Sequence, residues 1–250
     1  MPFTISHAAA AVPFQRTRLV LSAIIVGSMA PDFEYFIHGR MTSRWSHTLP
    51  GVFEFSLPAA LIVLAAFHYI LKRPVVALLP TAVQRRITLG EFSFWPLPRF
   101  LLITASALVG VATHLLWDSF THPGAWAVEH ISWFHETTVV LGRPLTNYKL
   151  SQHGSTLLGL GILFAWFLWW FRSTESRREV RPVFSAWSKS GIVIAIIVIA
   201  AVLGIFRALN VIGPHPFSVG FVANAVVMFV SVTMLEMVIF SLAVRHRVSS

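Results

Sequence analysis

The sequence contains no cysteine. This absence excludes disulfide bonds, and it also excludes metal sites built from thiolate ligands. Any metal ion that the protein binds must therefore be held by imidazole and carboxylate groups. Such donors accept Zn²⁺, Mn²⁺, Fe²⁺ and Ni²⁺ alike.

Charged residues are scarce as well. They make up 12% of the 250 residues, and hydrophobic residues make up 56%, whereas a soluble domain carries about 25% charged residues. The mean hydropathy is +0.72. Several apolar runs approach the roughly 20 residues that cross a bilayer as a helix. The composition therefore predicts a multi-pass integral membrane protein.

The apolar runs predict an all-α fold, a polytopic membrane helix bundle. Five transmembrane helices are expected, at about 52–71, 100–120, 154–171, 190–208 and 219–244. We find no internal repeat, low-complexity tract or interdomain linker between them. Residues 1–250 are therefore expected to form a single integral membrane domain.

The first 31 residues do not fit a simple span. Residues 5–14 and 19–30 are apolar, but each piece is too short to cross a bilayer, and Pro13 and the polar residues 15–18 separate them. Two helices broken at a turn form a hairpin. Such an N-terminal broken helical hairpin would bring His7 and Asp32 to the same end. A single bent span, with His7 on the cytoplasmic side, is the alternative.

The net charge of +9 does not indicate a nucleic-acid partner, because most basic residues fall in short loops between apolar runs. Segments 72–99 and 172–189 and the tail 245–247 are rich in lysine and arginine. Such segments face the cytoplasm, and five alternating spans allow all three to do so. The loops 32–51, 121–153 and 209–218 are then expected to face outward.

The segment THLLWDSFTHPG places His114, Asp118 and His122 four residues apart. Residues at this spacing lie on one face of a helix. Ionisable groups within a span cost a few kcal/mol each, and they usually have a partner inside the bundle. A metal ion would satisfy His114 and Asp118 together, as in other two-ligand helical motifs. The alternative is a neutral histidine that donates a hydrogen bond to the carboxylate.

Further polar residues come from separate segments that are all expected at the outer end of the bundle. The predicted metal ligands are His7, Asp32, His47, His114 and Asp118, and possible additional ligands are Glu34, His38, His122 and His153. This convergence favours a metal site over a scatter of structural histidines. Arg40 and Arg44 flank the cluster and are predicted to bind a phosphate or carboxylate. Contact of both arginines with lipid headgroups is the alternative.

The segments MPFTISHAAA, GSMAPDFEYF and SHTLPG resemble a bacterial family known as domain of unknown function 4184. More distantly, the order of an early histidine, PDF, His-Gly-Arg, Ser-His and HxxxD resembles membrane-bound metal-dependent hydrolases. Those are similar in turn to zinc-dependent phospholipase C and nuclease-type enzymes. The resemblance implies a metal-assisted hydrolase in a bacterial cytoplasmic membrane, with His7, Asp32, His47, His114 and Asp118 as ligands. The chain departs from the distant pattern in its longer 40–47 segment and in carrying Glu34 instead of a second aspartate.

The predicted function is that of a membrane-embedded hydrolase that depends on a divalent metal, with Zn²⁺ as the expected ion. Its site would open toward the outer leaflet and act on a lipid or lipid-linked phosphoester. Asp32 would serve as a ligand or general base, and Arg40 and Arg44 would neutralise the substrate. Two alternatives remain: a transporter for a metal or small ion, and a non-catalytic membrane protein with a closed, structural metal site.

Overall fold

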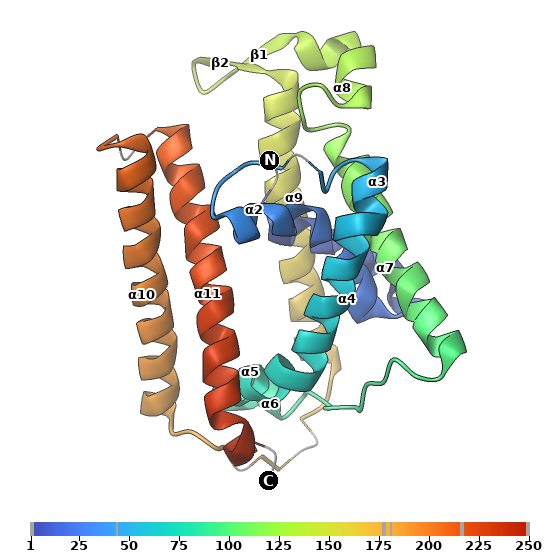
Figure 1. Ribbon diagram of the computed structural model, residues 1–250, viewed down its shortest axis with the longest axis vertical. Coiled ribbons are helices and arrows are strands. Elements are labelled where there is room, and N and C mark those ends of the chain that lie inside the picture. Colours follow the sequence, from blue (N-terminus) through green and yellow to red (C-terminus); the bar gives the residue numbers. More distant parts are fainter. Residues whose placement is uncertain (1–2, 44, 177–178, 181, 216–217, 249–250) are drawn as a thin grey trace. The chain divides into compact units, whose positions relative to one another are not determined.

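The computed structural model describes residues 3–43, 45–176, 179–180, 182–215 and 218–248. The chain is mostly helical, as predicted (Figure 1). Among the described residues, five helices are long and apolar enough to cross a membrane: Leu49–Leu78, Leu97–Asp118 (α7), Asn147–Ser173 (α9), Ala186–Ile212 (α10) and Val219–Val248 (α11). These are the five predicted spans. Most extend beyond the predicted bounds, because a helix continues into polar residues that an apolar run does not include.

The first long helix is built from five consecutive segments. They are α3 (Leu49–Gly51), the π-helical η3 (Val52–Ser56), α4 (Leu57–Ala66), the π-helical η4 (Phe67–Leu71) and α5 (Lys72–Leu78). Pro58 and Pro74 follow the two π segments within three residues. Proline has no backbone N–H and disturbs the preceding helical turn, which is consistent with a π segment at each place. The helix begins where Thr48 accepts a hydrogen bond from the Gly51 backbone N–H.

The N-terminal residues form the predicted hairpin. Its first arm is the 3-10 helix η1 (Thr4–Arg16), and its second arm comprises α1 (Leu21–Gly27) and the short 3-10 helix η2 (Ala30–Asp32). The arms contact each other, and both pack against α7. The hairpin therefore returns the chain to the end at which it started, with His7 and Asp32 brought together.

Glycine allows α1 and α7 to approach each other closely. A Cβ atom at Gly110 would overlap the carbonyl oxygen of Ile24, and one at Gly27 would overlap that of Ala107. The backbone N–H of Val20 donates to the Ser106 hydroxyl across the same pair of helices, at 3.0 Å. Small residues let helix backbones meet in this way in membranes. The contact fixes the position of η2 relative to the end of α7.

We expect Gly110→Ala to lower the free energy of unfolding by about 1–3 kcal/mol, because the added methyl group forces two backbones apart. Gly161→Ala is the matched control, since a Cβ atom at this α9 position meets no described residue within 4 Å. Thermal unfolding of both variants in detergent measures the difference. Equal stability of the two variants would contradict the tight α1–α7 contact.

The described residues form two compact units. The first comprises residues from 1–32, 45–64 and 93–170, and the second comprises residues from 33–44, 65–92 and 171–250. In the second unit, α10 and α11 run side by side (Figure 1). There α11 also packs against α5, η4 and α2 (Phe33–His38), and the Ser231 hydroxyl donates to the Phe36 carbonyl at 2.9 Å. The short α6 (Thr81–Gln84) belongs to this unit as well.

The loop before α9 has a structure that the apolar runs do not reveal. It contains α8 (Trp126–His130), the 3-10 helix η5 (Ser132–His135) and an antiparallel hairpin of β1 (Thr137–Val140) and β2 (Arg143–Thr146). The two turn residues, Leu141 and Gly142, both have positive φ angles, of 51° and 76°. Tight hairpins favour such turns, but leucine at the first turn position is not a turn signal in a sequence.

Candidate metal centre

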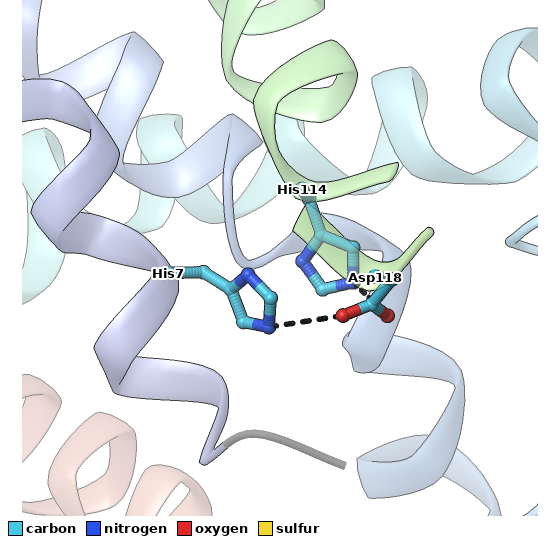
Figure 2. A group of neighbouring side chains, drawn as sticks. All are labelled: His7, His114 and Asp118. Carbon is cyan, nitrogen blue, oxygen red and sulfur yellow. Dashed lines mark ion pairs between the residues drawn. The ribbon is translucent and has the colours of Figure 1, made fainter. Parts of the chain in front are cut away.

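The candidate ligands of the first unit converge at the end of α7. His114 and Asp118 come from the last turn and a half of α7, His7 comes from η1, and Asp32 ends η2. His47 lies just before α3. Figure 2 shows the side chains of His7, His114 and Asp118 directed toward one another from η1 and α7. Segments far apart in the sequence therefore supply one cluster.

One oxygen of Asp118 faces His47 and His114. The Asp118 Oδ2 atom lies 3.2 Å from His114 Nε2 and 3.5 Å from His47 Nε2, and the two nitrogens are 3.3 Å apart. Asp32 completes this group, since its Oδ1 atom lies 3.7 Å from His114 Nε2 and 3.8 Å from His47 Nε2. Ligands of a tetrahedral zinc ion with bonds near 2.0–2.1 Å are separated by roughly 3.3 Å. The observed spacing fits such an ion after small adjustments.

The other oxygen of Asp118 faces a different pair of histidines. The Asp118 Oδ1 atom lies 3.5 Å from His7 Nε2 and 3.4 Å from His122 Nδ1. The His122 Nδ1 atom also lies 3.1 Å from the hydroxyl of Thr121. The carboxylate of Asp118 thus stands between two sets of imidazoles, one on each oxygen.

The hydrogen bond of His114 to the backbone determines which ring nitrogen can bind a metal. Its Nδ1 atom lies 2.8 Å from the carbonyl oxygen of Ser28, and a carbonyl oxygen can only accept. Nδ1 therefore carries the proton, and in the neutral ring the lone pair is on Nε2, which faces His47 and Asp118. Metal-ligating histidines are usually oriented in this way by a second hydrogen bond.

His7 is buried, and neither ring nitrogen has a hydrogen-bond partner among the described residues. Burial, chiefly, lowers the pKa of His7 to about 3, so its ring is neutral and retains a lone pair. The ring is held by packing, because it stacks on His114 at 4.0 Å and meets the edge of Trp117. A buried polar atom without a partner costs about 1–3 kcal/mol. A bound cation would offset this cost.

The cluster is closed on one side and open on the other. The side chains of His7, Asp32 and His114 are at most 1% exposed, whereas those of His47 and His122 are 26% and 24% exposed. Ser46 contacts the His47 ring on its far side, with 3.0 Å between the Ser46 hydroxyl and His47 Nδ1. Solvent or a substrate would therefore reach the centre past His47 and His122.

These positions form two overlapping groups that can hold a metal ion. The groups are His7, His114 and Asp118, and Asp32, His47 and His114, and within each the ligand atoms lie within 4.8 Å of one another. All donors are imidazoles and carboxylates, the combination expected for a chain without cysteine. The five predicted ligands thus lie together, and His122 adjoins them.

The remaining predicted site residues lie elsewhere. Glu34 is buried on α2, and His38 and Arg40 are exposed; all three belong to the second unit. His153 is exposed on α9. None of these four is in the two metal-binding groups found among the described residues. Arg44 lies outside the described residues, so the substrate-binding role of Arg40 and Arg44 stays a prediction.

Three residues of the site were not predicted: Ser28, Ser46 and Thr121. Ser46 and Thr121 directly precede the histidines that they contact, so their positions in the sequence offered a signal. Ser28 acts through its backbone carbonyl. Every residue has such a group, so no sequence signal distinguishes it.

The chain belongs to the family described as Domain of unknown function (DUF4184), whose profile matches residues 1–242. No curated protein and no solved structure matches it.

Proposed function

We propose that this member of the DUF4184 family is a membrane-embedded hydrolase whose centre takes two divalent ions bridged by Asp118. The observation that supports the proposal is the division of four histidines between the two oxygens of this carboxylate. Its Oδ2 atom faces His47 and His114, and its Oδ1 atom faces His7 and His122. Bridging carboxylates of this kind are suited to ions about 3.5–4 Å apart, as in two-metal hydrolases.

The two halves of the centre differ in their number of protein ligands. The first half offers four donors, from Asp32, His47, His114 and Asp118, which matches a closed, structural zinc site. The second half offers three, from His7, His122 and the other oxygen of Asp118. Three protein ligands with one open position are typical of catalytic zinc. The second half is therefore the proposed place of hydrolysis.

When bound there, a zinc ion would act as a Lewis acid and lower the pKa of a coordinated water to about 7. The residues of the chain orient the ligands and set the polarity around them. The backbone of Ser28 holds the His114 ring in one tautomer. Asp32 is fully buried, so a ligand role suits it better than that of a general base exchanging protons with solvent.

The proposed substrate is a lipid or lipid-linked phosphoester. The open side of the centre lies at the end of a membrane span, and large apolar side chains near this end of α7 are exposed, namely Leu116, Phe120 and Trp126. Aromatic side chains gather at the level of lipid headgroups. The positive-inside pattern predicts that this end faces outward.

Metal content and phosphodiester hydrolysis test the proposal together. We expect about two equivalents of zinc in detergent-purified protein after reconstitution, measured by elemental mass spectrometry. Hydrolysis of bis(p-nitrophenyl) phosphate should require the ions, disappear after chelation and return with zinc. Two bound ions without any hydrolysis of this probe or of phospholipid micelles would remove the catalytic role and leave a structural centre.

A further inference from the structure

A second polar feature lies in the second unit and shares no residue with the metal centre. A cavity of about 330 Å³ is bounded by η4, the start of α5, the loop 89–92 and the end of α11. The polar side chains in its lining are His68, Tyr69, Lys72, Arg73, Glu91 and Arg245. The formal charge of the lysine, the two arginines and the glutamate is +3 − 1 = +2. The cavity is therefore an anion-attracting site.

The walls of the cavity are held in place by contacts within the unit. The ammonium group of Lys72 donates to the carbonyl oxygen of Gly90 at 2.7 Å, which ties the loop to the helix. The ring of His68 stacks on Phe92, with centroids 3.7 Å apart and an interplanar angle of 6°. α11 packs against η4 and α5. The site thus has a defined shape, with stacked aromatic rings in its lining.

Lys72 has donors to offer a ligand. A lysine ammonium has three N–H donors. Among the described residues, one donor of Lys72 is used, in the hydrogen bond to the Gly90 carbonyl oxygen. Arg73 and Arg245 are exposed and reach the cavity from α5 and from the last turn of α11. Arginine forks bind phosphate oxygens in pairs.

The position of the cavity in the chain favours a lipid ligand. Apart from the loop 89–92, its lining comes from the C-terminal parts of two apolar helices, Leu49–Leu78 and Val219–Val248, so it lies at the level of a membrane surface. Both ends belong to the basic segments predicted on the cytoplasmic side. Basic pockets between membrane helices on that side bind anionic headgroups. Its volume is near the lower limit of the roughly 300–1,000 Å³ of ligand pockets, which suits a headgroup rather than a whole lipid.

We propose that this cavity binds the phosphate headgroup of an anionic phospholipid, with Lys72, Arg73 and Arg245 as its ligands. Pro74, Leu89 and Val248 also line the cavity and would contact the glycerol portion. The site is separate from the proposed hydrolase centre in sequence and in unit. Its occupant is a bound lipid of the membrane and not a substrate.

The test is lipid binding by the full-length protein in detergent, measured by native mass spectrometry and by thermal stabilisation. The probes are phosphatidylglycerol, phosphatidylcholine and inorganic phosphate. We expect phosphatidylglycerol to bind at least tenfold more tightly than phosphatidylcholine. The double variant Arg73→Gln/Arg245→Gln should lower the affinity for phosphatidylglycerol at least about tenfold. Inorganic phosphate should compete weakly.

Arg85→Gln/Arg172→Gln is the matched control, because it also removes two positive charges from the basic segments predicted on the cytoplasmic side, but from residues that do not line the cavity. Its affinity for phosphatidylglycerol should stay within twofold of the wild-type value. An equal loss in both double variants would mean that diffuse surface charge attracts the lipid, and it would overturn the site. Tight binding of inorganic phosphate without preference between the lipids would overturn the lipid assignment. Metal content and phosphodiester hydrolysis are not expected to change in either double variant.

Discussion

Asp118→Asn is expected to reduce bound zinc to below about one tenth of an equivalent and to lower phosphodiester hydrolysis at least about 100-fold. Loss of a residue that merely orients a metal ligand costs about 10–100-fold in metal affinity or activity, and in the proposed centre Asp118 binds both ions directly. The asparagine keeps the size of the side chain but loses its charge and one acceptor oxygen. Elemental mass spectrometry and the hydrolysis assay measure the two effects.

The control is Glu136→Gln, which neutralises an exposed carboxylate in the same unit, outside the two metal-binding groups. It should retain both ions and full activity. If Asp118→Asn keeps both equivalents of zinc, the carboxylate does not bridge, and the two-ion centre is wrong. If it loses one equivalent only, Asp118 binds a single ion.

His7→Phe is expected to change stability and function in opposite directions. Phenylalanine can keep the stacking on His114 but cannot bind a metal, so zinc content should fall from two equivalents to one. Hydrolysis should fall at least about 100-fold, because the ion with the open position is the one lost. The metal-free protein should become more stable by about 1–3 kcal/mol, since two buried nitrogens without hydrogen-bond partners among the described residues disappear.

Thermal unfolding in the presence of a chelator measures this stabilisation. His153→Phe is the control, since His153 is an exposed histidine of the same unit, and it should change neither zinc content nor stability of the metal-free form. A His7→Phe protein that is destabilised and still binds two ions would show that His7 is a packing residue and not a ligand. An opposite effect on stability and activity is common where a site contains strained or unpaired groups.

The sequence predicted the helical architecture because membrane spans depend on a local property. An apolar run of sufficient length forms a helix in a bilayer whatever surrounds it, so all five spans were found, with bounds that differ by at most seven residues from those of the structure. The pair of His114 and Asp118 was equally accessible, because the spacing of i and i+4 positions follows from helix geometry alone. The N-terminal hairpin was predicted from the same reasoning, since neither of its apolar pieces can cross a membrane.

Only the tertiary structure decided how these parts form one centre. His47 lies in a loop 67 residues before His114, yet their Nε2 atoms are 3.3 Å apart; no periodicity relates two such positions. The division of the Asp118 oxygens between two histidine pairs depends on the rotamer of one side chain. The tautomer of His114 depends on the Ser28 carbonyl, which reaches it because Gly27 and Gly110 let two backbones meet. The sequence by itself determined which residues can bind a metal, because donor chemistry belongs to the side chain. The fold decided which of them lie close enough to share an ion, because the distances between donors depend on packing between distant segments.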